Sequence, residues 1–262
     1  MANIRTFADV KNVILSAHKN TGAQDKVGFY DKWAEYYEQD VALLDYRAPF
    51  LAAECVNSFC RGDREKITVL DVACGTGLVS SHVCIALFKF WAKTECDRSA
   101  NRKINVTLFL NPIWLRKLKK MGFHHFVGVD GSLGMLELAK KTGLYQQLTH
   151  CMLGQDPIPA EAATYDIVII VGALSVGQVP LTVIRELCEA AKPGGYVCMT
   201  TRGNADNREY KGELEQMIRS LEEEKKWSCV TVVEVEEWEK AVSQKDDGYI
   251  PGAIYLYQKS IP

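Results

Sequence analysis

The chain has 262 residues, of which 47% are hydrophobic, so it is long enough to bury one full α/β core and we expect a single domain. Its formal net charge of -2 argues against a nucleic-acid partner, because no global positive field would attract a phosphate backbone. It has no apolar run of about 18 residues and no signal-peptide pattern, so we expect no membrane partner and a cytoplasmic or nuclear location.

The first part of the chain is predicted to hold two helices followed by a strand. Residues 29–44 mix aromatic and acidic side chains at helical spacing, and residues 47–59 predict a second helix. The apolar segment 67–72 predicts a buried strand that runs into a glycine turn at 74–77. The next strand is expected at 126–129, and it ends at Asp130.

Residues 80–117 are atypical for the segment between these two strands. A βαβ unit needs only about 30 residues in total, so something additional is inserted here. The segment 84–91 is apolar all round, and 105–112 has neither a helical nor a strand period. We interpret the segment as an insertion, with a retained intron as one origin that sequencing the transcript would test. Deletion of 81–115 is expected to restore or strengthen cofactor binding.

Downstream of Asp130 the pattern alternates between helices and strands. Ser132 is predicted to cap a helix, and helices with one apolar face are expected on either side of the strand at 196–201. The strands are expected at 148–152, 165–171, 196–201, 229–235 and 253–258, with the last pair antiparallel. This alternation predicts an α/β fold with a doubly wound sheet.

The glycine turn after the first strand carries the strongest functional signal. Glycines at 75 and 77 would let the backbone pass close to a ligand. The dinucleotide fingerprint G-x-G-x-x-G would need a third glycine where this chain has Ser80. Asp71, four residues before Gly75, would also repel a pyrophosphate, whereas it would attract the cationic S-adenosylmethionine.

Asp130 supports a nucleoside cofactor. A carboxylate at the end of this strand can accept hydrogen bonds from both ribose hydroxyls of an adenosyl group. The same role occurs in NAD sites, so Asp130 alone does not choose between the two cofactors. The alternative is a turn aspartate in the sequence Asp-Gly-Ser.

Four motifs in order resemble those of class I methyltransferases. They are DVACGTG at 71–77, GVDGS with Met135 and Leu136 at 128–136, YDIV at 165–168 and KPGG at 192–195. The segments 29–34, 46–49, 143–145 and 171–180 are similar to one group within that family. The resemblance implies a Rossmann-like seven-stranded, mostly parallel sheet with helices on both faces, and S-adenosylmethionine as cofactor.

The resemblance also implies a domain organisation and a set of cofactor contacts. A single methyltransferase domain spans 1–262, with an N-terminal helical lid at 1–60, the insertion at about 80–117, and a Rossmann-like core at 61–79 and 118–262. The residues implied to surround the methionine end of the cofactor are Asp71, Ala73, Gly75 and Gly77. Asp130 would hold the ribose. The residues implied to flank adenine are Gly131, Ser132 and Met135, with Gln155, or the adjacent Asp156, near its amine.

Val171 and Gly172 are implied to line the reaction centre, and Tyr30, Trp33 and Tyr37 to form a lid. On spacing alone, such an aromatic stripe is more typical of core packing, and the resemblance favours the lid.

The nine cysteines, among them Cys74, Cys198 and Cys229, show no Cys-x-x-Cys pair and are expected to be reduced and buried. No metal site is expected, because His124 and His125 lack companion ligands at zinc-like spacing.

Methyl transfer is an in-line displacement that depends on alignment and desolvation, so no nucleophilic protein residue is required. The catalytic residue stays unassigned; Tyr37, Ser175 and the neighbourhood of Arg202 are candidate bases. Residues 171–174 lack the Asn-Pro-Pro-Tyr type of sequence, which resembles sites of amino-group methylation in nucleic acids. We therefore expect the acceptor to be a small molecule or a protein, and we expect the enzyme to be monomeric. The alternatives are a non-catalytic protein that binds S-adenosylmethionine and an NAD-dependent oxidoreductase.

Overall fold

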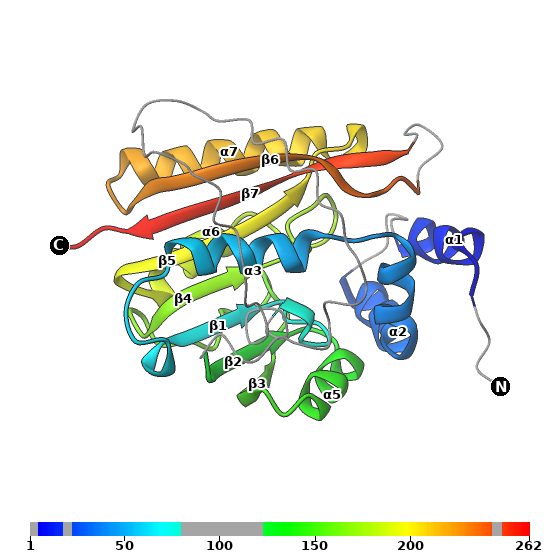
Figure 1. The fold of residues 1–262 in the computed structure, drawn as a ribbon, viewed down its shortest axis with the longest axis horizontal. Helices are drawn as coiled ribbons and strands as arrows, with labels where there is room; N and C mark the ends of the chain where they lie inside the picture. Colours follow the sequence, from blue (N-terminus) through cyan, green and yellow to red (C-terminus); the bar gives the residue numbers. More distant parts are fainter. Residues whose placement is uncertain (1–4, 18–22, 80–122, 243–247) are drawn as a thin grey trace.

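The computed structural model describes residues 5–17, 23–79, 123–242 and 248–262. These residues form one seven-stranded sheet with helices on both faces, as Figure 1 shows. The predicted insertion at about 80–117 lies outside the described residues. Within the described ranges, no helix has both the length and the apolar character needed to cross a membrane.

The sheet has the strand order β3-β2-β1-β4-β5-β7-β6. The strands are β1 (Thr68–Val72), β2 (His125–Asp130), β3 (Tyr145–His150), β4 (Tyr165–Ile170), β5 (Ala191–Arg202), β6 (Trp227–Lys240) and β7 (Tyr249–Lys259). The first five run parallel, and β7 pairs antiparallel with both β5 and β6. The predicted seven-stranded, mostly parallel sheet and its antiparallel final pair are therefore confirmed.

Helices cover both faces of this sheet and its carboxyl edge. They are α1 (Phe7–Ala17), α2 (Ala23–Leu43), α3 (Ala48–Phe59), α5 (Leu133–Lys141), α6 (Val183–Ala190) and α7 (Arg208–Glu223), with short 3₁₀ turns η1 (Arg64–Lys66) and η3 (Ala205–Asn207). In Figure 1, α3 crosses the face toward the viewer, whereas α6 and α7 lie behind the sheet. The α1 and α2 helices stand beside the edge toward which β1, β4 and β5 point.

Alternation along β1 divides the core into two layers. Val69 packs in the cluster that contains α3, whereas Leu70 and Val72 pack in the cluster that contains α6 and α7. Successive side chains of a strand point to opposite faces, so a strand buried on both faces is apolar throughout. Asp71 is the exception, and at 1% exposure its carboxyl group is enclosed by the fold.

The strand order reverses between β1 and β4. From β1 the chain builds β2 and β3 on one side, and then crosses to place β4 and β5 on the other. Ligands of open α/β sheets bind outside the carboxyl ends of the strands at such a switch point. The glycine turn that follows β1 and Asp130 at the end of β2 both lie at this position.

Several strand boundaries differ from the sequence expectation, including β7, which begins at Tyr249 and not at 253. Strand β3 begins at Tyr145, before the expected 148–152, because it is an edge strand whose polar residues hide the apolar pattern. In β5, pairing with β4 skips from Ala191 to Tyr196, so the predicted break at 192–195 is an irregularity inside the strand. Strand β6 continues through charged residues to Lys240, beyond the expected 229–235.

Seven cysteines fall within the described residues, and all seven are free thiols, as expected. Six of them are buried. The expectation was wrong for Cys229, which is exposed. This residue lies on β6, the edge strand of the sheet, which pairs with a neighbouring strand on one side only.

Candidate active site

The glycine turn departs from the backbone conformation of ordinary residues at three positions. Ala73, Gly75 and Gly77 have φ values of 54°, 55° and 87°, in the left-handed region that glycine tolerates and alanine adopts at a cost. A β-carbon built on Gly75 would meet no atom within 4 Å. The turn therefore presents open backbone at the carboxyl end of β1, as a bound ligand requires.

Asp130 links this turn to the start of the next helix. Its two carboxylate oxygens accept hydrogen bonds from the backbone N–H groups of Gly75 and Ser132, both at 2.8 Å. Burial raises the pKa of Asp130, and the N–H donors from Ser132 and Gly75 act in the opposite direction. The Ser132 hydroxyl accepts from Met135 N at 3.1 Å, so Ser132 caps α5 as predicted.

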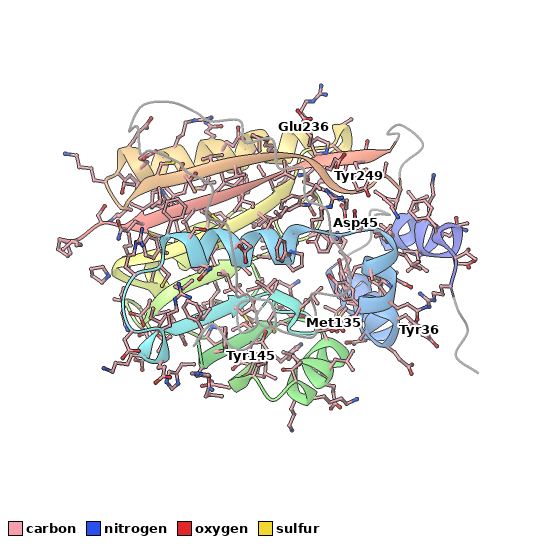
Figure 2. All side chains as sticks on the ribbon, in the orientation of Figure 1. Tyr36, Asp45, Met135, Tyr145, Glu236 and Tyr249 are labelled. Atoms are coloured by element: carbon pink, nitrogen blue, oxygen red, sulfur yellow. The ribbon has the colours of Figure 1, made fainter. Side chains whose placement is uncertain are left out.

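Asp71 lies beneath the turn, inside the sheet. Its carboxylate accepts a hydrogen bond of 2.7 Å from the hydroxyl of Tyr145, which Figure 2 labels. The Tyr145 ring also lies close to the turn, because a β-carbon built on Gly77 would approach it to 3.0 Å. The Tyr145 side chain therefore reaches from β3 across Gly128 of β2, and it supports both the carboxylate and the glycine turn.

The two carboxylates make the turn electronegative. Burial raises the pKa of the Cys74 thiol well above its usual value, and Asp71 and Asp130 raise it further. A negative potential at this point stabilises a cation and repels a phosphate. The turn thus fits a ligand with a sulfonium and an ammonium group better than it fits a dinucleotide, which supports the choice made from Asp71 and Ser80.

Helix α2 docks on the first turn of α5. The carboxylate of Asp31 accepts hydrogen bonds from the Ser132 hydroxyl at 2.6 Å and from Gly134 N at 2.9 Å. A β-carbon at Gly134 would lie 2.9 Å from the backbone oxygen of Asp31, so the helices meet closely at this glycine. Met135, labelled in Figure 2 between these helices, is buried at the same junction.

The aromatic stripe on α2 serves both as core and as cavity wall. Trp33 is buried, and its indole N–H donates to the Asp40 carboxylate at 2.7 Å. Tyr30 and Tyr37 pack in the same cluster, and all three residues line a cavity beside the sheet. Tyr30 also donates a hydrogen bond of 3.3 Å to the Gln178 side chain, which lies after β4.

The cavity lies between α2 and the carboxyl ends of β4 and β5 and has a volume of about 300 Å³. Its aromatic lining comes from Tyr30, Trp33, Tyr37, Tyr46 and Trp238, and its polar lining includes Ser175, Gln178, Thr200, Thr201, Arg202, Asn204, Asp206 and Glu239. Burial raises the pKa of Tyr30 to about 12, and Asp130 contributes in the same direction while Arg202 opposes it. This interaction with Asp130 connects the cavity electrostatically to the glycine turn.

Gly172 forms part of the cavity wall after β4. Its backbone N–H donates to the Thr200 hydroxyl at 3.0 Å, and its φ of 78° lies in the left-handed region. A β-carbon at this position would overlap the hydroxyl of Tyr46. Val171, the preceding residue, is buried. The predicted reaction-centre residues therefore lie beside the aromatic side chains of the predicted lid.

The predicted adenine-side residues lie at the other end, around the β2 and β3 termini. Gly131 follows Asp130, and a β-carbon on it would lie 3.2 Å from the Met152 sulfur. Gln155 is exposed in the loop after β3, and its backbone N–H donates to Met152 O at 2.9 Å. The alternative residue, Asp156, accepts from Met152 N at 3.3 Å.

Most of the cavity residues were absent from the sequence-based site, and three of them matter for the chemistry. Tyr46 belongs to the linker between α2 and α3, Asn204 follows β5, and Glu239 lies near the end of β6. The segment 46–49 was among those that resemble the family, but the resemblance implied no role for Tyr46. No local pattern identifies Glu239, because residues 236–240 are mostly charged and do not show the apolar alternation of a strand.

Two observations concern groups that could bind a metal ion or form a hydrogen bond with a ligand. In the described parts of the chain, no three His, Cys, Asp or Glu side chains are grouped so that they could hold a metal ion. The buried Thr76 hydroxyl, in the glycine turn, has no hydrogen-bond partner among the described residues. An unsatisfied buried hydroxyl costs free energy, which a bound ligand at the turn would recover.

Comparisons with known proteins agree with this geometry. Residues 38–242 match the family model described as a methyltransferase domain. The chain is 39% identical over 257 residues to human (Homo sapiens) methyltransferase-like protein 27, covering 98% of this chain and 88% of that protein. This relative represents the group within the methyltransferases that the additional motifs resemble, so that expectation is confirmed.

Solved structures share the fold at lower identity. A chain from the Haloferax volcanii complex of the Trm112 activator with a methyltransferase is 13% identical, with a TM-score of 0.57, covering 89% of this chain and 96% of that chain. DhpI, solved in complex with SAH, is 17% identical, with a TM-score of 0.52, covering 92% and 98% of the two chains. These two similarities concern the fold alone.

The family match and the sequence relative favour methyl transfer over the NAD-dependent alternative. The fold, the electronegative glycine turn and the position of Asp130 at the end of β2 agree with S-adenosylmethionine as the methyl donor. The chain therefore belongs to the methyltransferase domain family and is a class I, S-adenosylmethionine-dependent methyltransferase.

Proposed function

We propose that this methyltransferase acts on a small molecule that binds in the cavity beneath α2. The observation that carries the proposal is the position of the cavity, which adjoins Gly172 and the aromatic residues of α2. Its volume of about 300 Å³ is at the lower end of the range for small-molecule pockets. A nucleic acid or a folded protein surface would need an open groove, whereas this space is bounded by helix and sheet.

The proposed cofactor site occupies the switch point between β1 and β4. Its residues are the predicted ones, Asp71, Ala73, Gly75, Gly77, Asp130, Gly131, Ser132, Met135, Gln155, Val171 and Gly172, with Tyr30, Trp33 and Tyr37 above. The hydrogen bonds that join Gly75, Asp130 and Ser132 support a common role for the first eight. Residues 1–60 are proposed to act as the lid, over a core of 61–79 and 118–262.

In this arrangement the protein contributes alignment and exclusion of water. When bound, S-adenosylmethionine supplies a methyl group on a positively charged sulfur. Tyr30, Trp33 and Tyr37 would exclude water from the reaction centre, while Gly172 leaves room for close approach along the line of transfer. Proton removal, where the acceptor needs it, falls to a cavity residue and not to the backbone.

Two measurements on the full chain test the proposal. Calorimetric titration with S-adenosylhomocysteine is expected to show binding, and a cell extract supplied with methyl-labelled donor is expected to yield label in the small-molecule fraction. Label in the protein fraction alone would replace the proposal with methylation of a protein side chain. Cofactor binding without label in any fraction would support the non-catalytic alternative.

A further inference from the structure

The Glu239 carboxylate lines the cavity without a direct hydrogen bond among the described residues, and Arg202 is the opposite charge that acts on it. Glu239, near the end of β6, lines the cavity, and its side chain takes part in no hydrogen bond or ion pair with the described residues. A carboxylate enclosed by protein is costly unless something pairs with it. The cavity therefore holds a negative group with which a cationic ligand would pair directly.

The backbone fixes where Glu239 points. On one side of it, Lys240 N donates to Leu44 O at 2.8 Å, and on the other side Arg47 N donates to Trp238 O at 3.1 Å. These two bonds attach the end of β6 to the linker that carries Tyr46. Both Trp238 and Glu239 line the cavity, at a point where the pairing of β6 with β7 is irregular between Val235 and Glu239.

A second set of contacts also holds the end of β6 and the start of β7 against the linker between α2 and α3. The Asp45 carboxylate accepts hydrogen bonds from Arg47 Nε at 3.1 Å and from the Tyr249 hydroxyl at 2.7 Å, and Figure 2 labels Asp45 and Tyr249 side by side. Arg47 also pairs with Glu237 at 3.0 Å. Arg47 is thus shared between the carboxylates of Asp45 and Glu237, whereas Glu239 lines the cavity.

The surroundings of Glu239 favour a cation. The charged side chains that line the cavity are Arg202, Asp206 and Glu239, so carboxylates outnumber guanidinium groups. The cavity walls also carry the rings of Tyr37, Tyr46 and Trp238. Aromatic faces attract ammonium groups, and the attraction grows when water is excluded.

We infer that the acceptor of the proposed small-molecule methylation is an amine, which enters as an ammonium ion and pairs with Glu239, the residue that then removes its proton. This inference rests on the proposed function. It adds the chemical class of the acceptor and a catalytic role for a residue that the glycine-turn and Asp130 motifs do not include.

The transfer balances with Glu239 as the base. One N–H bond of the ammonium breaks, the proton passes to the Glu239 carboxylate, and the lone pair stays on nitrogen. That lone pair forms the N–C bond to the methyl carbon while the S–C bond breaks and its electron pair remains on sulfur. The methylated nitrogen then bears the positive charge that sulfur had carried, and Glu239 returns its proton to water.

Burial makes Glu239 a better base than an ordinary glutamate. Burial raises its pKa to about 7, and the opposite charge of Arg202 lowers it only in part. The other titratable groups around it are Tyr30 and Tyr37 from α2, Tyr46 from the linker and Asp206 after β5. A carboxyl near neutral pKa accepts a proton from an amine with a smaller free-energy penalty than one at its usual value.

The test compares amines with alcohols of matched shape. The probes are benzylamine, 2-phenylethylamine and cyclohexylamine, each paired with its alcohol, and their dissociation constants are measured by ligand-observed NMR on the full chain saturated with S-adenosylhomocysteine. At least one amine is expected to bind about 10-fold more tightly than its alcohol. Glu239→Gln should abolish this preference, whereas Glu236→Gln, at an exposed position of the same strand, should preserve it.

A pH series distinguishes a direct role from a structural one. In the wild type, amine affinity should rise between about pH 6 and about pH 8 as Glu239 ionises, and in Glu239→Gln it should stay flat. The inference is overturned if no amine outperforms its alcohol at millimolar concentration, or if Glu239→Gln and Glu236→Gln behave alike. Failure of S-adenosylhomocysteine to bind would instead refute the proposed function.

Discussion

The hydroxyl of Tyr46 occupies the space into which a side chain at Gly172 would extend. These two residues lie 126 positions apart by their numbers, one in the α2–α3 linker and the other after β4. Their contact brings the proposed lid and the sheet together at the predicted reaction centre. The size of residue 172 therefore determines how closely the linker can approach the carboxyl end of the sheet.

Gly172→Ala is expected to lower the free energy of unfolding by about 1–3 kcal/mol. It adds a methyl group that overlaps the Tyr46 hydroxyl, and it forces alanine to adopt a φ of 78°. Methyl transfer should fall as well, because the linker must move. Urea denaturation and transfer of labelled methyl groups measure the two effects.

Two further variants separate the overlap from the backbone strain. Adding Tyr46→Phe to Gly172→Ala should recover the part of the loss that comes from the hydroxyl and leave the strain. Gly212→Ala on α7, where an added β-carbon would meet nothing within 4 Å, should stabilise the protein slightly. Equal unfolding midpoints for Gly172→Ala and the wild type would contradict the contact described here.

Asp130→Asn is expected to weaken binding of S-adenosylhomocysteine by about 10-fold to 100-fold. The amide replaces one acceptor oxygen with an NH₂ group, which faces a backbone N–H of Gly75 or Ser132 and cannot accept from it. Calorimetric titration measures the loss. Asp63→Asn, at the exposed cap of η1, is the control and should leave affinity unchanged; equal losses in both variants would count against a ribose-binding role.

Asp31→Ala is expected to loosen the lid. It removes the acceptor for the Ser132 hydroxyl and for Gly134 N, so α2 would lose its polar attachment to the start of α5. Limited proteolysis should then cut within residues 23–44 more rapidly, and cofactor affinity should decrease. Glu35→Ala, at an exposed position of the same helix, provides the comparison, and faster cleavage there to the same extent would exclude a specific role for Asp31.

Glu239→Gln is expected to stabilise the protein at alkaline pH. Folding holds the pKa of Glu239 at about 7, above the value for an unfolded chain, so its contribution to stability is full at acid pH and is lost as the pH rises through about 7. Glutamine has no charge to bury. The variant should therefore gain about 1–3 kcal/mol over the wild type between about pH 5 and about pH 8.

Urea denaturation across this pH range measures the gain. Glu236→Gln is the matched control, because residue 236 is exposed and its carboxylate is solvated in both states. Its stability should follow that of the wild type at each pH. If the free energies of unfolding of Glu239→Gln and the wild type differ by the same amount at every pH, the carboxyl of Glu239 titrates as an ordinary glutamate.

The core of the fold could be predicted from local patterns. Strand β1, the glycine turn after it and Ser132 at the start of α5 each depend on residues adjacent in sequence: an apolar run, residues that tolerate positive φ, and a hydroxyl that caps a helix. The position of Asp130 could be predicted because a residue at the end of a parallel strand lies at the carboxyl edge of the sheet.

The acceptor side of the site was decided by contacts between distant segments. The charged end of β6 gives no strand pattern, and it forms a strand because Glu239 and Lys240 pair with β7, while Leu44 and Arg47 add hydrogen bonds from the linker. The same contacts turn Glu239 toward the cavity and set Tyr46 against Gly172. Sequence by itself determined the family, the sheet and the cofactor, since each depends on local spacing. Only the tertiary structure decided what surrounds the acceptor, because burial and charge pairing depend on which distant side chains meet.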